Sequence, residues 1–330
     1  MAELRADLVL EGGGVKGIAL VGAISVLEER GYEFHRVAGT SAGAIVGALV
    51  AAGFRASELH EIMQSVRYPE FQDGGPLDHA GLFGKAIELV FEHGIYKGDQ
   101  LKKWLGDLLR KKGVERFGQV HLDPPDPVVG PEQQHRLVVM ASDISGGELR
   151  RLPWDYHVFG VVADEALLVD AVRASMSIPF FYEPVKLENA DGQPCWLVDG
   201  GMLSNFPIGV FDRAVGERPR WPTFGIKLSA RPDAPQHIVN DVHGTVSMTK
   251  AMIETMTGFY DRMHIDEPGV LARTIFVDTM KVPATDFGIS GETQQQLYDN
   301  GRAAATAFLD GGPGRPAWNF DDYIAKYRSG

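Results

Sequence analysis

The chain has 330 residues, a formal net charge of −12 and a single cysteine. The acidic balance argues against nucleic acid as a partner, because phosphate backbones bind basic surfaces, and one cysteine cannot form an intrachain disulfide. No apolar run reaches the roughly 18 residues of a membrane span, and residues 1–5 lack the pattern of a signal peptide. We therefore expect a cytoplasmic protein, and the sequence leaves peripheral membrane contact and export by a specialised secretion system open.

The first predicted unit is a strand over 7–10, a glycine-rich turn over 11–17 (EGGGVKG) and a helix over 17–30. Glycines let backbone N–H groups approach an anion closely, so the turn predicts an anion cradle. The spacing of Gly12, Gly14 and Gly17 is also the G-x-G-x-x-G fingerprint of a dinucleotide site. This turn alone leaves both interpretations open.

The second unit is a strand over 34–38, a turn over 39–43 (GTSAG) and a helix over 42–52. Gly39, Ser41 and Gly43 have the G-x-S-x-G form of a nucleophile elbow, in which a tight strand-to-helix turn presents the serine hydroxyl to a cleft. A serine presented in this way beside an anion cradle is the minimum equipment for acyl transfer to serine.

The remaining pattern alternates strands and helices, which predicts a layered α/β fold. Residues 54–120 read as an irregular helical insertion, and its amphipathic helix over 99–112 is expected to bury an apolar stripe, with a lipid-facing cap as the alternative. We expect one domain over 1–310 and a packed tail over 311–330. Further strands are predicted over 136–141, 148–152, 178–185, 196–198, 223–228 and 274–277, and further helices over 164–175, 242–263 and 293–309.

A serine nucleophile needs a group that accepts its proton. Asp199 is the best candidate, because it follows an apolar strand and precedes Gly200 and Gly201. The carboxyl ends of strands are where α/β sheets place their ligands. An unperturbed aspartate is a weak base with a pKa near 3.9, and partial burial raises that value. A plain turn aspartate is the alternative interpretation, since Asp-Gly is a common turn signal.

A histidine triad is the competing hypothesis, because His237, His243 and His264 follow Asp199 in the Ser…Asp…His order of an α/β-hydrolase. These histidines stand in polar helical or loop contexts, and only one clear strand precedes the strand that carries Ser41. We therefore expect them to be dispensable. The sequence has no H-E-x-x-H motif, EF-hand loop or clustered set of His, Cys and Asp, so we expect no metal and no cofactor.

Four segments, in the same order along the chain, together resemble the patatin-like phospholipases. They are an oxyanion loop at 12–17 with Lys16 at its basic position, a nucleophile motif at 39–43, a Ser/Pro block at 174–181 that contains Pro179, and an aspartate motif at 199–201. The likeness covers residues 5–230 except for 54–135. Glu11 departs from it, because aspartate often stands there in the family, and we interpret Glu11 as structural.

The resemblance implies a three-layer α/β/α fold with a mostly parallel central sheet and a helical cap-like insertion. It implies a dyad of Ser41 and Asp199 that hydrolyses fatty-acyl esters of lipids or lysolipids through an acyl-enzyme, with no histidine, metal or calcium. Backbone N–H groups of Gly13, Gly14 and Val15 would form the oxyanion hole. Phospholipase A, lysophospholipase and carboxylesterase activities stay open, as does the oligomeric state. A Rossmann-type dinucleotide binder and a non-catalytic lipid-binding protein of the same fold are the alternatives.

Overall fold

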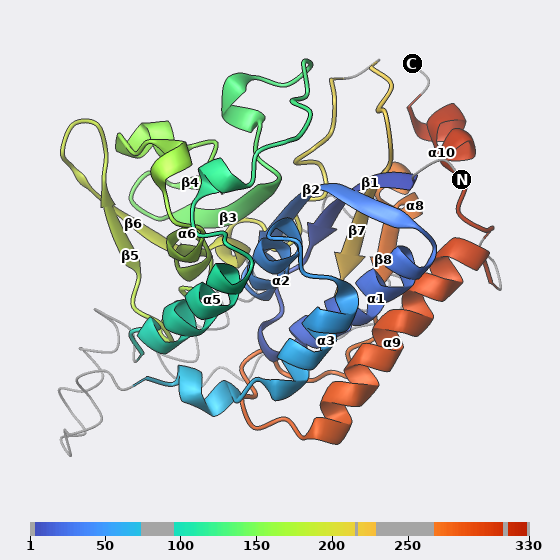
Figure 1. The fold of residues 1–330 in the computed structure, drawn as a ribbon, viewed down its shortest axis with the longest axis horizontal. Coiled ribbons are helices and arrows are strands. Elements are labelled where there is room, and N and C mark those ends of the chain that lie inside the picture. Colours follow the sequence, from blue (N-terminus) through green and yellow to red (C-terminus); the bar gives the residue numbers. More distant parts are fainter. Residues whose placement is uncertain (1–3, 74–95, 215–216, 229–266, 313–315, 329–330) are drawn as a thin grey trace.

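An eight-stranded mixed sheet forms the centre of the structure, a computed structural model that describes residues 4–73, 96–214, 217–228, 267–312 and 316–328. The strand order is β5-β6-β3-β2-β1-β7-β8, with β4 beside β3 (Figure 1). The strands are β1 (Leu4–Leu10), β2 (Tyr32–Thr40), β3 (Leu137–Asp143), β4 (Glu148–Leu152), β5 (Val185–Glu188), β6 (Pro194–Asp199), β7 (Thr223–Lys227) and β8 (Thr274–Phe276). The neighbours from β3 to β8 run parallel, whereas β4 and β6 run antiparallel to β3 and β5 runs antiparallel to β6. The mostly parallel α/β sheet predicted from the sequence is confirmed.

The central strands are buried on both faces, and alternate residues serve different cores because strand side chains point to opposite faces. In β1, Leu8 and Leu10 join the larger core with the helices, whereas Val9 joins a smaller core on the other face. That second face is covered in the described part of the chain by the irregular segment 204–212 and by α8 (Pro268–Ala272), which contribute Phe206, Ile208, Phe211 and Val270.

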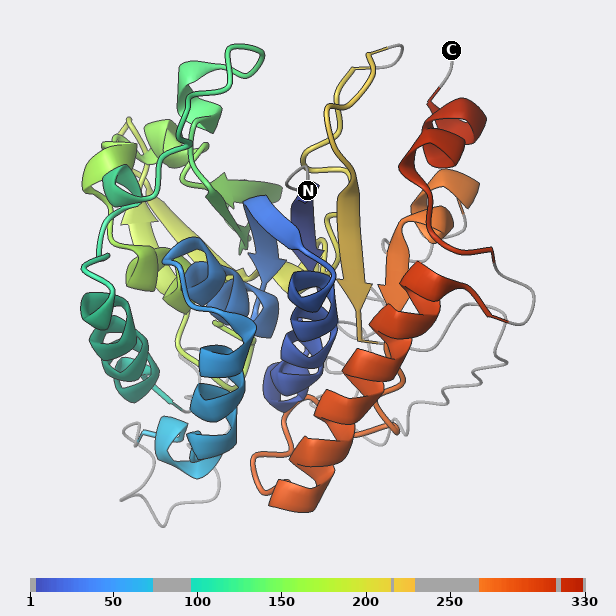
Figure 2. The same cartoon turned by 45° about the vertical axis from the view of Figure 1, so that its right-hand side comes forward.

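Helices cover the first face of the sheet (Figure 2). The central helix α1 packs against α3 and against the long helix α9, so these three lie side by side. The helices of this layer are α1 (Gly17–Glu29), α2 (Ala42–Ala51), α3 (Ala56–Ser65), α5 (Asp99–Lys111), α6 (Leu168–Ser175) and α9 (Gly291–Asp310). None of the described helices is long and apolar enough to cross a bilayer.

The predicted strand over 178–185 is wrong for most of its length. Residues 178–182 form a turn in which the Tyr182 N–H donates to the Ile178 carbonyl at 2.9 Å, and β5 begins only at Val185. Pro179 has no N–H for a strand ladder, and Phe180 has a φ of 68°, which extended backbone does not allow. The predicted helix over 164–175 divides into a 3-10 turn (Ala163–Glu165) and α6.

The amphipathic helix of the predicted insertion buries its stripe, as α5 places Leu101, Leu105 and Leu109 in the core. Residues 74–95 lie outside the described part, so a cap formed by this insertion over the acyl site stays a prediction. The predicted helix over 242–263 also lies outside the described residues.

The C-terminal tail is attached by aromatic stacking. The Trp318 ring stacks on Phe308 of α9 at a centroid distance of 5.2 Å and meets Tyr323 of α10 (Phe320–Tyr327) at 5.5 Å. The tail therefore lies along the edge of the sheet beside β8 (Figure 1).

Candidate active site

Ser41 stands on a strained turn between β2 and α2. Its φ is 53°, a left-handed value that costs energy for a residue with a side chain, and its carbonyl accepts the first N–H groups of α2, from Ala44 and Ile45. The turn needs glycine on both sides: a Cβ on Gly43 would lie 2.3 Å from the Leu10 carbonyl oxygen, and one on Gly39 would lie 2.2 Å from the Gly43 carbonyl oxygen. The G-x-S-x-G spacing therefore forms the sharp elbow that the sequence predicts.

The register of β3 brings Asp199 to this elbow. β4 pairs with one edge of β3 along residues 139–143, so β2 and β6 must share the other edge. Thr40, the last residue of β2, pairs with Met140, and Asp199, the last residue of β6, pairs with the next residue of β3, Ala141. The two strands run in opposite directions, so their carboxyl ends meet end to end.

The Asp199 carboxyl group is buried and electrostatically perturbed. The residue is 6% exposed, and burial raises the pKa of its carboxyl group to about 6. The Gly201 N–H, which donates to Asp199 Oδ1 at 2.7 Å, and the nearby Ser41 hydroxyl oppose that rise. A carboxylate with this pKa is half ionised near pH 6 and is a stronger base than an ordinary aspartate.

The C-terminal end of α6 contacts Ser41 directly. The Ser41 N–H donates to Ser175 Oγ at 2.9 Å, and Ser41 Oγ lies 3.5 Å from Met176 Sδ. Both contacts come from the segment that was singled out from the sequence as a Ser/Pro block. Its serine therefore holds the elbow backbone, while Pro179 lies in the turn that follows.

The glycine-rich loop lies beside the elbow and leaves two of its N–H groups open. Gly12 N–H donates to Asn205, and Val15 N–H donates to the Ala284 carbonyl at 3.0 Å. Within the described residues, the N–H groups of Gly13 and Gly14 have no hydrogen-bond partner. Of the three backbone N–H groups expected to form an oxyanion hole, only those of Gly13 and Gly14 are therefore available, because the Val15 N–H already donates to Ala284.

Asn205 is a site residue that the sequence analysis missed. Its Nδ2 donates to the Gly12 carbonyl at 3.0 Å and its own carbonyl accepts the Gly12 N–H at 3.2 Å. Its Oδ1 occupies the space that a Cβ on Gly12 or Gly201 would need, at 2.2 and 2.8 Å. Asn205 therefore joins the oxyanion loop to the aspartate turn. The only sequence signal for it is its position shortly after the Asp-Gly-Gly motif.

Buried charges support the base of the loop. Glu11 forms an ion pair with Lys227, and its other oxygen accepts the Leu228 N–H. Burial lowers the pKa of the Lys16 ammonium, an effect that nearby Glu11 opposes and Lys227 reinforces. Glu11 therefore has the structural role expected from the sequence, as it fastens the loop after β1 to the end of β7.

Other candidate groups lie elsewhere or cannot be placed. His237, His243 and His264 lie outside the described residues. The expectation that no His, Cys and Asp cluster exists is wrong for the folded chain, because His121, His135 and Asp164 converge, although they do so away from Ser41.

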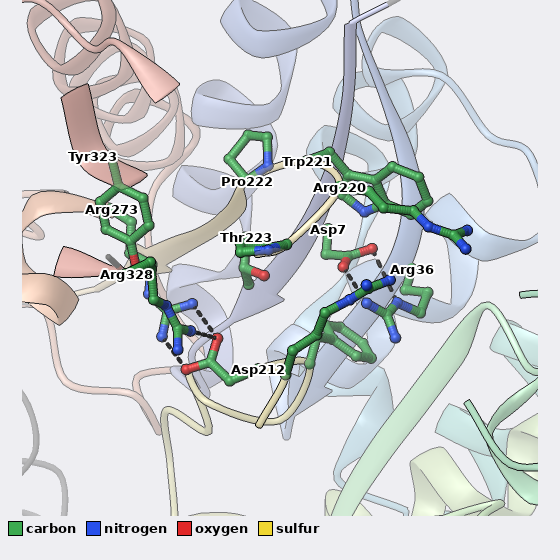
Figure 3. Close-up of a pocket in the computed structure, with 13 residues that line it drawn as sticks. Asp7, Arg36, Asp212, Arg220, Trp221, Pro222, Thr223, Arg273, Tyr323 and Arg328 are labelled. Carbon is green, nitrogen blue, oxygen red and sulfur yellow. Dashed lines mark hydrogen bonds and ion pairs between the residues drawn. The ribbon is translucent and has the colours of Figure 1, made fainter. Parts of the chain in front are cut away.

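A charged pocket at the opposite end of the parallel strands is filled by its own ion pairs (Figure 3). Asp212 lies between Arg273 and Arg328, at 2.5 and 2.7 Å, and Asp7 pairs with Arg36 at 2.5 Å. The cavity volume of 10 Å³ leaves room for about one water molecule. The Asp212 pairs link the end of α10 to the residue before β8, the Asp7 pair joins β1 to β2, and the pocket offers no room for a substrate.

Comparison with known proteins identifies the family of this chain. The model of the patatin-like phospholipase family matches residues 8–212, and the chain belongs to that family. The protein YqhO of Bacillus subtilis, described as uncharacterized, is 37% identical over 304 residues, which cover 92% of this chain and 97% of YqhO. The probable lipid hydrolase 463L of Invertebrate iridescent virus 6 is 24% identical over 209 residues, 62% of each chain.

Two solved bacterial structures are similar to this chain at low sequence identity. VipD from Legionella pneumophila has a TM-score of 0.49 at 18% identity, over 91% of this chain and 66% of VipD. ExoU, solved in complex with SpcU of Pseudomonas aeruginosa, has a TM-score of 0.49 at 16% identity, over 92% of this chain and 50% of ExoU. Family membership and the viral relative together support a lipid hydrolase as the general class of this chain.

Proposed function

We propose that this protein hydrolyses fatty-acyl esters of lipids or lysolipids, with Ser41 as the nucleophile and Asp199 as the general base. The observation that carries the proposal is the end-to-end approach of β2 and β6 on one edge of β3, which sets a strained serine beside a buried carboxylate. Family membership supplies the lipid substrate class.

In the first half-reaction, Ser41 Oγ attacks the ester carbonyl carbon while ionised Asp199 takes the hydroxyl proton. The negative charge on the carbonyl oxygen is stabilised by the N–H groups of Gly13 and Gly14, and each such donor is worth about 3–4 kcal/mol. The carbon–oxygen bond to the alcohol or lysolipid then breaks, and that oxygen receives the proton from Asp199. An acyl-enzyme on Ser41 remains.

In the second half-reaction, Asp199 removes a proton from a water molecule, and the resulting hydroxide attacks the acyl carbon. The same donors stabilise the second oxyanion. When the bond to Ser41 Oγ breaks, that oxygen regains a proton from Asp199, and the free fatty acid leaves. The cycle consumes one water per ester and needs no other co-reactant.

The dinucleotide alternative loses its main support in the fold. A Rossmann site needs an acidic side chain at the carboxyl end of the second strand to bind the ribose. Glu33, the residue at about the right sequence spacing, pairs with Arg5 at the amino end of β2, whereas the glycine turn lies at the carboxyl end. The two features cannot contact one ligand.

The test is active-site labelling with a fluorophosphonate, followed by mass spectrometry and by assays of Ser41→Ala on a p-nitrophenyl acyl ester and on lysophosphatidylcholine micelles. We expect the label on Ser41 and a loss of activity of at least a hundredfold in the variant, which should remain folded. Ser65→Ala is the matched control, because its exposed hydroxyl only bonds the Ile62 carbonyl. Retention of more than about a tenth of the activity by folded Ser41→Ala would refute the assignment. Ester cleavage without release of fatty acid from the lipid would restrict the function to simple esters.

A further inference from the structure

Two histidines and one aspartate converge where the loop before β3 meets the segment before α6. His121 Nε2 lies 2.8 Å from Asp164 Oδ1, and His135 Nε2 lies 2.9 Å from the same oxygen. The candidate ligand atoms of the three residues all lie within 4.8 Å of one another. Across the ranges that the structure describes, this is the one group of three His, Cys, Asp or Glu residues with such convergence.

Backbone hydrogen bonds hold the three residues in place independently of their side chains. His121 and His135 face each other in an antiparallel bridge, flanked by bonds from Leu122 N–H to Gln134 and from Arg136 N–H to Val120 at 2.7 and 2.8 Å. The Asp164 turn is fixed on the same side, because the Phe117 N–H donates to the Ala166 carbonyl at 3.0 Å. The cluster is therefore preorganised by the fold.

His135 is the most deeply buried member of the cluster. Its side chain is 2% exposed. Its Nδ1 lies 3.3 Å from the Glu132 carbonyl, and its Nε2 is directed at Asp164 Oδ1. Nε2 therefore points into the cluster, where it can serve as a ligand atom.

We propose that His121, His135 and Asp164 bind a Zn²⁺ ion. Two imidazole nitrogens and one carboxylate oxygen suit zinc, and a histidine whose other nitrogen donates to a backbone carbonyl is the usual arrangement of a zinc ligand. Ligand atoms about 2.1 Å from a tetrahedral zinc are separated by about 3.4 Å. His121 and Asp164 have side chains that are 40% and 54% exposed, so both can move outward by the roughly half an ångström required. Water would fill the fourth position.

The site lies away from the ester chemistry. His135 precedes the amino end of β3, whereas Ser41 follows the carboxyl end of β2, which runs parallel to β3. Zinc here would fasten the 117–136 segment to the segment that leads into α6. The last residue of α6 is Ser175, which holds the Ser41 N–H. The proposed role is therefore to stabilise the fold behind the site, and it stands whether or not the proposed ester hydrolysis is correct.

The test uses the full chain, freed of metal with a chelator and dialysed. Calorimetric titration with ZnCl₂ should give one bound ion per chain with a micromolar or tighter Kd, and Zn²⁺ should raise the Tm. His121→Gln and Asp164→Asn should each weaken binding at least tenfold and remove most of the Tm increase. His157→Gln is the matched control, because its Nδ1 also contacts a backbone carbonyl three residues earlier, that of Trp154 at 3.0 Å, and within the described part His157 belongs to no group of converging ligand atoms. Its Zn²⁺ affinity should equal that of the unmodified chain.

Three results would overturn the proposal. The first is a metal-free chain whose Tm does not respond to Zn²⁺. The second is an undiminished Zn²⁺ affinity in both His121→Gln and Asp164→Asn. The third is an equal Tm increase with Mg²⁺, which prefers oxygen ligands and should not occupy a site with two imidazoles. Both substituted side chains are largely at the surface, so the variants should fold, and the two test the cluster independently of one another.

Discussion

Thr40 and Asp199 occupy consecutive positions along the same edge of β3, because Thr40 pairs with Met140 and Asp199 pairs with Ala141. β2 runs parallel to β3 and β6 runs antiparallel to it, so the residues just past the carboxyl ends of β2 and β6 meet. Ser41 is the residue after Thr40. The proposed dyad is therefore brought together by the strand register along β3.

The pH dependence of turnover should follow the Asp199 carboxyl group. Its pKa of about 6 in the folded chain means that the ionised base is lost below that pH. We expect kcat/KM for a p-nitrophenyl acyl ester to fall about tenfold per pH unit below pH 6 and to level off above pH 7. Initial rates between pH 4.5 and 8 measure this. A profile that is flat between pH 5 and 7 would contradict the assignment of the base.

Neutralising the same carboxyl group should stabilise the fold at high pH. A folded-state pKa raised from 3.8 to about 6 means that wild-type stability is fully present below about pH 4 and declines as pH rises through 6. That difference corresponds to about 3 kcal/mol. Asp199→Asn retains an oxygen for the Gly201 N–H and carries no titrating group at this position. Relative to wild type, its free energy of unfolding should therefore be about 3 kcal/mol more favourable at pH 8 than at pH 4.

Urea unfolding of both proteins at the two pH values is the measurement, and activity should fall by two to four orders of magnitude in the same variant. Asp191→Asn, in the exposed turn between β5 and β6, is the control and should change neither quantity. If the free energy of unfolding of Asp199→Asn falls below that of wild type by the same amount at both pH values, burial of the charge is not what raises the pKa of Asp199.

Asn205→Ala should lower kcat by more than a loss of folding stability can explain. The substitution removes the Nδ2 donor to the Gly12 carbonyl and opens space between the oxyanion loop and the aspartate turn. We expect a tenfold to hundredfold loss of kcat, with a smaller change in KM, because misplaced oxyanion donors act on the transition state. Asn189→Ala is the control, because the Asn189 side chain also hydrogen-bonds the backbone, by accepting the N–H groups of Asp191 and Gln193 in the β5–β6 hairpin. A KM effect without a kcat effect would contradict the positioning role.

Histidines should be dispensable for turnover. In the sequence, Ser41 and Asp199 stand beside glycines after an apolar strand, and none of the three histidines His237, His243 and His264 has such a context. We therefore expect each Gln variant to lose less than tenfold in kcat/KM, which corresponds to about 1.4 kcal/mol of barrier. Steady-state assays of the three single variants test this. A thousandfold loss in one of them, together with an active Asp199→Asn, would establish a triad in place of the dyad.

Removal of metal by a chelator should change the stability of the chain and leave the rate of ester hydrolysis unchanged. EDTA should leave the initial rate of ester hydrolysis at 25 °C unchanged, since the histidine cluster lies at the amino end of β3 and away from Ser41. Strong inhibition that calcium or zinc reverses would mean that a metal takes part in the reaction. The assay is run with and without prior dialysis against the chelator.

The amino-acid sequence by itself determined the elements whose chemistry is local. The glycine before Ser41 is readable because a neighbour in the chain creates the crowding: Gly39 approaches the Gly43 carbonyl oxygen of the same strand-turn-helix unit. The crowding at Gly43 comes from Leu10 of the preceding unit, but the G-x-S-x-G spacing still marks this glycine in the sequence. Asp199 could likewise be recognised as a strand-end carboxylate before two glycines. The apolar stripe of α5 follows from helical periodicity and is buried as predicted.

Only the tertiary structure decided the relationships between residues that are distant in the chain. The register that sets Asp199 one position beyond Met140, the Asn205 link to Gly12 and the Ala284 carbonyl that occupies the Val15 N–H have no local signal. The same holds for His121, His135 and Asp164, whose spacing matches no metal motif because separate segments supply the ligands. The physical reason is that local sterics and periodicity act within a few residues, whereas pairing partners and shared cavities depend on how the whole sheet assembles.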